Sequence, residues 1–232
     1  MVDTIVPVSS TTVAETAKLH ENTFRAVNIA LANELALMCD KIGVDVWEVI
    51  SAASTKPFGF LPHYPGPGLG GDCIPTVPHF LSWRLRQAGY SSRMIEAAHE
   101  VNAQMPLHAV QKVIDALNDD AKPVRVSRIL LLGITYKPGV RDLRESPSLE
   151  VMRLLIERGG NVRFCDPLVG ECFVAGQAHT SVPWTREEAE AADCVMLLTA
   201  HPEFVEVPHW RAARRIVDTR NALPRGAAVR GI

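Results

Sequence analysis

Apolar side chains in the first forty residues recur at spacings of three and four, which is typical of a helix with one buried face. The positions that follow this spacing are Val13, Ala17, Phe24, Val27, Leu31, Leu35, Met38 and Ile42. Ser10 or Thr11 offers an N-cap, and Gly43 is a stop signal. The pattern therefore predicts a long helix ending at Ile42, followed by a short helix over residues 45–53.

Residues 56–75 contain too many prolines and glycines for regular structure and predict a long irregular loop. Its last part reads PGPGLGGDCIPTVP, residues 65–78, and leads into an apolar segment that predicts a helix over residues 77–88. Glycines let a backbone approach a ligand closely, and a cysteine such as Cys73 near a helix start is favoured as a thiolate. An inert cysteine in an ordinary turn explains the same residues equally well.

The character of the sequence changes after a further helix over residues 92–118, which we expect to bend near Pro106. Beyond it, short apolar runs predict buried strands at 128–135, 161–166, 194–199 and 215–219. Helical segments alternate with them at 148–158, 186–192 and around Trp210. The alternation predicts an α/β protein: an all-helical domain, residues 1–120, followed by an open doubly wound parallel α/β (Rossmann-like) domain, residues 121–232.

Composition narrows the classes of function. The chain has 232 residues, 47% of them hydrophobic and 22% charged, and its net charge of -2 favours neither nucleic acid nor an anionic membrane as a partner. We expect a cytoplasmic protein, because no apolar window is long enough to span a membrane. The five scattered cysteines predict free thiols, and the eight histidines form no metal-binding motif, so we expect no metal site.

Two polar constellations are candidates for chemistry. Lys18 and Asn22 are four residues apart on one helix face and could donate together to an oxyanion, although a solvated helix face is the commoner reading of such a pair. The stretch TYKPGVRDLRESP, residues 135–147, follows a predicted strand, where α/β sheets bind phosphates, but its cations could equally lie on an ordinary surface loop. The chain contains no GxGxxG dinucleotide fingerprint.

Four collinear segments, taken together, resemble the nucleotide-sugar 6-dehydrogenases, the UDP-glucose/GDP-mannose dehydrogenase family. They are AETAKLHENTFRAVNIALANELALMCDKIGVDVWEVI, TKPFGFLPHYPGPGLGGDCIP, GITYKPGVRDLRESPSLEVMRLLIERGGNVRFCDP and VDTRNAL. The branch that oxidises UDP-N-acetylglucosamine or UDP-N-acetylmannosamine is the most similar. The resemblance implies NAD-dependent two-step oxidation of the sugar 6-hydroxyl to a carboxylate through a cysteine thioester.

The resemblance also implies a role for individual residues. Cys73 corresponds to the nucleophile, and Lys18 and Asn22 to the pair that supports the oxyanion and the attacking water. The residues implied to bind the UDP-sugar are Tyr64, Gly66, Gly68, Leu69, Gly70, Tyr136, Lys137 and Arg220, with Lys56 as a weaker candidate across a subunit interface. Arg144 would touch NAD, and the first long helix would form the core of a homodimer.

Two departures from the family pattern weigh against independent turnover. The family's N-terminal NAD-binding Rossmann domain has no counterpart in this sequence, and Val77 stands where the family has an aspartate. Asp72 also places a carboxylate beside the nucleophile, which disfavours a thiolate. We therefore expect a truncated UDP-sugar 6-dehydrogenase that is inactive alone; the alternative is a non-catalytic dimeric module that binds a UDP-sugar or associates with a partner. A cysteine hydrolase is a weaker third reading.

Overall fold

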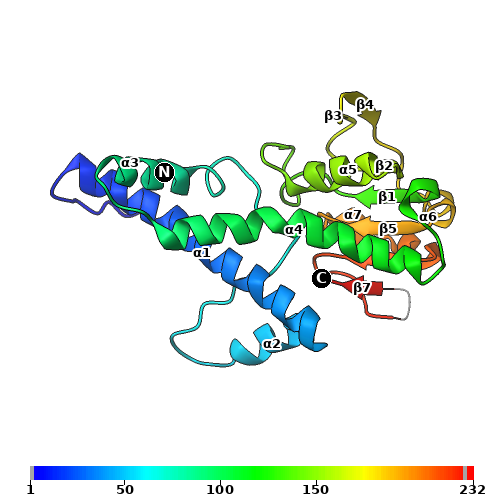
Figure 1. Cartoon of the computed structure of the whole chain (residues 1–232), viewed down its shortest axis with the longest axis horizontal. Helices are drawn as coiled ribbons and strands as arrows, with labels where there is room; N and C mark the ends of the chain where they lie inside the picture. Colours follow the sequence, from blue (N-terminus) through cyan, green and yellow to red (C-terminus); the bar gives the residue numbers. More distant parts are fainter. Residues whose placement is uncertain (1–2, 227–228) are drawn as a thin grey trace.

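The computed structural model describes residues 3–226 and 229–232, which form a helical part and an α/β part (Figure 1). The helical part consists of α1 (Thr11–Ile42), α2 (Val46–Ala53), α3 (Val77–Gln87) and α4 (Arg93–Asn118). Residues 56–75 between α2 and α3 contain neither helix nor strand, as predicted. The four helices predicted for this half of the chain are confirmed to within one or two residues.

Local chemistry explains where these helices begin and end. The Ser10 side chain accepts a hydrogen bond from the Val13 amide at the start of α1, and Gly43 ends the helix in the left-handed conformation at φ 70°. Asp45 caps α2 in the same way by accepting from the Trp47 amide. No helix within the described ranges, 3–226 and 229–232, is both long and apolar enough to cross a membrane.

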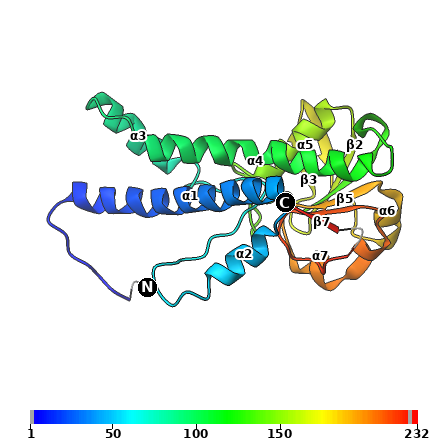
Figure 2. The same cartoon turned by 60° about the horizontal axis from the view of Figure 1, so that its bottom comes forward.

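Helix α4 connects the two parts. Its N-terminal half lies along α1 (Figure 2), whereas its C-terminal half packs on the sheet of the α/β part. The helix continues through Pro106. This residue is buried at the point where the partner of α4 changes from α1 to the sheet. Five of its side chains belong to the largest apolar core, namely Ala109, Val110, Val113, Ala116 and Leu117.

The α/β part is built on one parallel sheet with strand order β2-β1-β5-β6-β7. These strands are β1 (Arg128–Leu132), β2 (Asn161–Cys165), β5 (Cys194–Leu197), β6 (Ile216–Asp218) and β7 (Val229–Gly231). The helical segments around them are α5 (Pro147–Glu157), α6 (Arg186–Ala191), α7 (Pro202–Glu206) and the 3-10 helices η1 (Val124–Val126) and η2 (Pro208–Ala212). Leu132 of β1 pairs with Cys165 on one side and Leu197 on the other, so the ends of three strands lie level.

Apolar cores on both faces of the sheet confirm the predicted open doubly wound fold. One core joins the sheet to α4 and α5, and the other, containing Phe204 and Trp210, joins it to the segments after β5. The hairpin of β3 (Glu171–Val174) and β4 (Gln177–Thr180) was not predicted, because β4 is largely polar and exposed and shows no apolar run. Strand β7 was missed for the same reason, since its three residues are only partly buried.

Candidate functional site

The glycine-rich loop, residues 65–71, lies between the helical part and the α/β part and is hydrogen-bonded to both. The Gly66 amide donates to the Asn33 side chain of α1 at 2.9 Å, and the Gly71 amide donates to the Arg144 carbonyl of the α/β part at 3.2 Å. Several backbone amides of the loop are thereby held at the edge of the sheet where the strands end. Ligands of open α/β sheets bind at that edge.

The side chains of two buried asparagines, Asn33 and Asn102, connect the loop to α1 and α4. Asn33 donates to Asn102 of α4 at 2.8 Å, and Asn102 donates to the Ala26 carbonyl of α1 at 3.2 Å. Both asparagines are buried, so these bonds replace the contact with water that each amide loses. The sequence predictions missed both residues, although asparagine inside a helix is unfavourable enough to be a weak signal.

Arg220 faces the loop at Gly66. A β-carbon on Gly66 would lie 2.6 Å from the Arg220 guanidinium, so a larger residue there would have to displace the end of the Arg220 side chain. The Arg220 Nε donates to the Leu198 carbonyl at 2.6 Å, and the Arg220 amide donates to Asp218 at 2.8 Å. Burial lowers the pKa of Arg220 to about 10 and Asp218 opposes that shift, so the side chain still carries its charge at neutral pH.

The predicted substrate-binding residues of the α/β part lie against the same loop. A β-carbon on Gly70 would lie 2.9 Å from the Tyr136 side chain, and the Lys137 ammonium is 5.4 Å from the centre of the Tyr136 ring. Tyr64 stacks on Trp47 of α2 with the ring centres 5.9 Å apart. The structure therefore brings the loop together with Tyr136 and Arg220, and it places the Lys137 ammonium near the Tyr136 ring.

Cys73 follows this loop and is the one exposed cysteine of the five. Its carbonyl accepts from the Val77 amide at 2.9 Å, which forms the turn that leads into α3. Burial raises the pKa of Cys165 and Cys194 to about 12 and that of Cys172 to about 11, which suits packing rather than reaction. Accessibility thus distinguishes Cys73 from every other thiol in the chain.

Lys18 and Asn22 have different environments. Lys18 is exposed and pairs with Glu21 at 2.9 Å, whereas Asn22 is buried in α1. Thr23, next to Asn22, lines the same cavity as Ile74, next to Cys73. Lys18, Asn22 and Cys73 are not themselves among the residues that line this cavity, so the structure does not bring the three together there, and their catalytic roles stay predictions.

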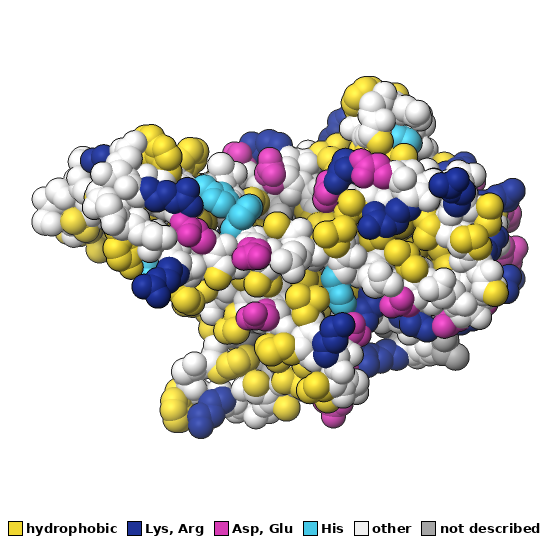
Figure 3. Space-filling model, viewed as in Figure 1, with side chains coloured by type: hydrophobic (Ala, Val, Ile, Leu, Met, Phe, Trp, Pro, Cys, Tyr) yellow, Lys and Arg dark blue, Asp and Glu magenta, His cyan; other side chains and the backbone are white. Residues whose placement is uncertain are grey.

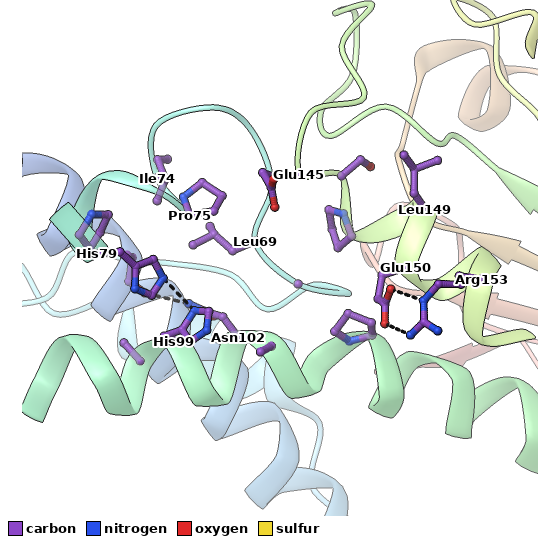
Figure 4. A pocket seen from close by; sticks show the side chains of 18 of the residues that line it. Leu69, Ile74, Pro75, His79, His99, Asn102, Glu145, Leu149, Glu150 and Arg153 are labelled. Carbon is purple, nitrogen blue, oxygen red and sulfur yellow. Dashed lines mark hydrogen bonds and ion pairs between the residues drawn. The ribbon is translucent and has the colours of Figure 1, made fainter. Parts of the chain in front are cut away.

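That cavity has a volume of about 620 Å³ and lies between α1, α3, α4, α5 and the β3–β4 hairpin (Figure 4). Its walls are apolar at Leu69 and Leu149 and polar at two side-chain pairs. His79 and His99 lie with ring nitrogens 3.1 Å apart, and burial together with His99 lowers the pKa of His79. Glu150 and Arg153 form an ion pair on the opposite wall.

Arg144, predicted to touch NAD, is engaged by two carboxylates. It pairs with Asp142 at 2.7 Å and with Asp72 at 2.8 Å. The bond from Arg144 holds the pKa of Asp142 below its usual range. Asp72 thus links the cysteine segment to the α/β part, and the contact of Arg144 with NAD stays a prediction.

The remaining predictions concern Lys56, Gly68 and metals. Lys56 lies just after α2, where its ammonium is 4.9 Å from the centre of the Phe58 ring, and it is not among the residues that line the large cavity. Gly68 packs closely on Pro147 and lines that cavity. Among the residues that the structure describes, no three or more histidines, cysteines or acids are placed to hold a metal ion.

Two family models match the chain. The central domain of the UDP-glucose/GDP-mannose dehydrogenase family matches residues 12–104, and the UDP binding domain of that family matches residues 130–225. UDP-N-acetyl-D-mannosamine dehydrogenase of Methanococcus maripaludis (strain C7) is 38% identical over 86% of this chain and 44% of its own length. NDP-N-acetyl-D-galactosaminuronic acid dehydrogenase of Ralstonia solanacearum is 38% identical over 89% of this chain and 47% of its own length.

A solved structure agrees with these matches. UDP-D-ManNAc dehydrogenase from Pyrococcus horikoshii superposes with a TM-score of 0.87 at 34% identity, over all of this chain and 54% of that one. The chain thus spans about half the length of the relatives that it matches.

Replacing Asn33 tests whether the two buried asparagines hold the loop. We expect Asn33→Ala to lower the free energy of unfolding by about 2–4 kcal/mol, because it leaves the Gly66 backbone amide and the side-chain oxygen of Asn102 buried without partners. Asn28→Ala is the matched control, since Asn28 only bonds back to its own helix and should change stability by less than about 0.5 kcal/mol. Urea unfolding measures both, and equal losses would refute the special role of Asn33.

Proposed function

Because the chain belongs to the UDP-glucose/GDP-mannose dehydrogenase family, we propose that it binds a UDP-sugar between the glycine-rich loop and the α/β part. The observation that carries the proposal is the close approach of the loop to Arg220 at Gly66 and to Tyr136 at Gly70. These contacts lie at the carboxyl edge of the parallel sheet. We call this region the seam: the loop at Gly66 and Gly70 forms one side, and Tyr136, Lys137 and Arg220 form the other. Its walls carry backbone amides, two cations and aromatic rings.

The chemistry of this seam suits a nucleoside diphosphate. Arg220 presents a charged guanidinium, and Lys137 adds an exposed ammonium, so both can contact the diphosphate. The rings of Tyr136 and Tyr64 offer flat surfaces to the uracil or the sugar. Gly66, Gly68, Leu69 and Gly70 would line the remaining backbone side of the UDP-sugar.

For the sugar, we propose a UDP-N-acetylhexosamine. The relatives named above act on N-acetylated mannose and galactose derivatives, as their names state. In the family reaction the Cys73 thiolate would add to the carbonyl carbon of the C6 aldehyde, while Lys18 and Asn22 would donate to the oxygen that becomes negative. Lys56 would contact a phosphate across a dimer interface.

The residues present do not make a complete NAD site. Arg144 is held by Asp72 and Asp142, and β1 is followed by GITYKPG rather than a GxGxxG turn. Hydride transfer requires a dinucleotide in fixed geometry, so we derive no oxidation step for these residues alone. The family's cofactor, NAD, would need a binding domain besides the parts described here.

A non-catalytic dimeric module is the second candidate. Val77 begins α3 where the family has a carboxylate, and Asp72 neutralises Arg144. Neither change touches Lys137 or Arg220. A chain that keeps the UDP-sugar seam and loses the catalytic surroundings would bind without turnover, alone or with a partner.

The first long helix supports a homodimer. Its exposed large hydrophobic residues from the first turn to the last are Val13, Phe24, Leu31, Met38 and Ile42. Their spacings of 11, 7, 7 and 4 are close to whole helical turns, so the five side chains form a single stripe. Figure 3 shows hydrophobic side chains gathered over the C-terminal half of α1 and over α2. A second copy of this helix would bury the stripe.

Binding of UDP is expected to depend on the two cations. Isothermal titration should show UDP binding to the wild-type chain that weakens about tenfold in Lys137→Ala, because a charge-assisted contact to phosphate is lost. Arg220→Lys should weaken it as well, since lysine keeps the charge but not the planar fork. Arg186→Ala, on the exposed surface of α6, is the control and should bind normally. The absence of heat with UDP would refute the seam as its site.

The dimer is expected to dissociate when the stripe on α1 is charged. Leu31→Glu should shift the chain from dimer to monomer in sedimentation experiments, because Leu31 is 60% exposed in one chain and would be buried between two. Met94→Glu is the control, because Met94 is 68% exposed but lies on α4. A wild-type monomer at micromolar concentration would contradict this interface.

Turnover by this chain alone is not expected. With NAD and a UDP-N-acetylhexosamine, the absorbance of NADH should not rise, since Arg144, the residue that the family resemblance assigns to NAD, is engaged by two carboxylates. Cys73→Ser serves as the blank for nucleophile-dependent turnover. NADH formed by the wild type but not by this variant would favour the enzyme over the binding module.

A further inference from the structure

We propose that the segment after β5, residues 198–201, together with Thr135 positions the two cations of the UDP seam. The proposal rests on the UDP-binding function above. None of these residues would touch the ligand. They would act by fixing the backbone that carries Lys137 and the side chain of Arg220.

A chain of hydrogen bonds clamps the turn that carries Lys137. The Gly139 amide donates to Nδ1 of His201 at 3.4 Å, which requires that this nitrogen carries no hydrogen. The other ring nitrogen, Nε2, then carries the hydrogen and donates to the Thr135 hydroxyl at 2.8 Å. That hydroxyl donates to the Lys137 carbonyl at 3.3 Å. One end of the turn at residues 137–139 is therefore bonded to the His201 ring and the other end to the Thr135 hydroxyl.

The same segment holds Arg220. The Leu198 carbonyl accepts from the Arg220 Nε at 2.6 Å, and the next residue, Thr199, donates through its hydroxyl to the Thr135 carbonyl at 2.5 Å. The amides of Leu198 and Thr199 both donate to the Leu132 carbonyl at the end of β1. One short segment of backbone thus bonds both to the Arg220 side chain and, through Thr135 and His201, to the turn that carries Lys137.

The side chains that make these hydrogen bonds are buried from water. Thr135, Thr199 and His201 are each 1% exposed or less. Asp166 accepts from the Ile134 and Thr135 amides at 2.8 and 3.2 Å and lies 3.5 Å from Nε2 of His201. Burial raises the pKa of Asp166, but the nearby His201 ring and the hydrogen bonds from the backbone amides outweigh this and keep it below its usual range. A side chain buried this completely cannot replace a lost partner with solvent.

Positioning matters here because the Lys137 side chain makes no ion pair of its own in the described part of the chain. Its ammonium rests over the Tyr136 ring, so the place of its backbone decides what the ammonium can reach. A phosphate contact depends steeply on distance and direction. Loosening the turn should therefore weaken UDP binding through Lys137 specifically.

The test compares Thr135→Val with Thr135→Ser by isothermal titration of UDP, each alone and combined with Lys137→Ala. Valine has nearly the volume of threonine but removes the hydroxyl, whereas serine keeps it. We expect the dissociation constant to rise about fivefold in Thr135→Val and to change less than twofold in Thr135→Ser. Combined with Lys137→Ala, the valine substitution should have no further effect, because its effect would act through Lys137.

Two measurements distinguish failure of the positioning role from failure of the UDP site itself. Hydrogen exchange at the Gly139 amide should be faster in Thr135→Val than in Thr135→Ser, and His201→Phe should repeat this effect if the valine variant does not fold. Additive losses in the double variant, or wild-type affinity in Thr135→Val, would overturn the positioning role while leaving the UDP site intact. A wild-type chain that binds no UDP would overturn the site itself and the positioning role with it.

Discussion

The hydrogen bond from the Gly66 amide to the buried side chain of Asn33 is the contact on which the arrangement of the site depends. It ties an irregular loop to α1, and Asn102 extends the tie to α4. The loop has no secondary structure to hold it in place. A buried amide with all its bonds made is costly to disrupt, and this cost lets a flexible segment keep one position against Arg220.

Helix α4 connects α1, which holds the loop, to the α/β part. Because it packs on α1 at one end and forms part of the core under the sheet at the other, the helical part and the sheet share one rigid element. The seam between loop and sheet can therefore stay narrow enough to bring Gly66 against a guanidinium. Two separately folded domains joined by a linker would not ensure such a close approach.

The site combines retained and altered features. Lys137 and Arg220 lie at the seam, and Cys73 is the accessible thiol at the end of the loop. Asp72 pairs with Arg144 and neutralises a cation that faces the nucleophile segment. Exposed ion pairs are individually weak, so this pairing restricts Arg144 without locking it. In the proposed function, recognition of a UDP-sugar would therefore depend on Lys137 and Arg220, and chemistry on the sugar would depend on Cys73 and its surroundings.

Much of the fold follows from the sequence itself. The helical spacing from Val13 to Ile42, the cap at Ser10 and the stop at Gly43 defined α1, because these signals act between residues close in the chain. The apolar runs defined four strands of the sheet, and the motifs located Cys73 and the loop before it. The hairpin and β7 were missed, because short polar strands depend on pairing with distant segments.

What only the tertiary structure decided is which groups meet. Asn33 and Asn102 are 69 residues apart, and Thr135 and His201 are 66 apart, so no local pattern could reveal either bond. The partner of Arg144 at Asp72 and the approach of Gly66 to Arg220 likewise depend on how two parts of the chain pack. Periodicity records the environment of single residues, whereas buried polar contacts require two distant residues to arrive at one place, which is settled by the packing of the whole fold.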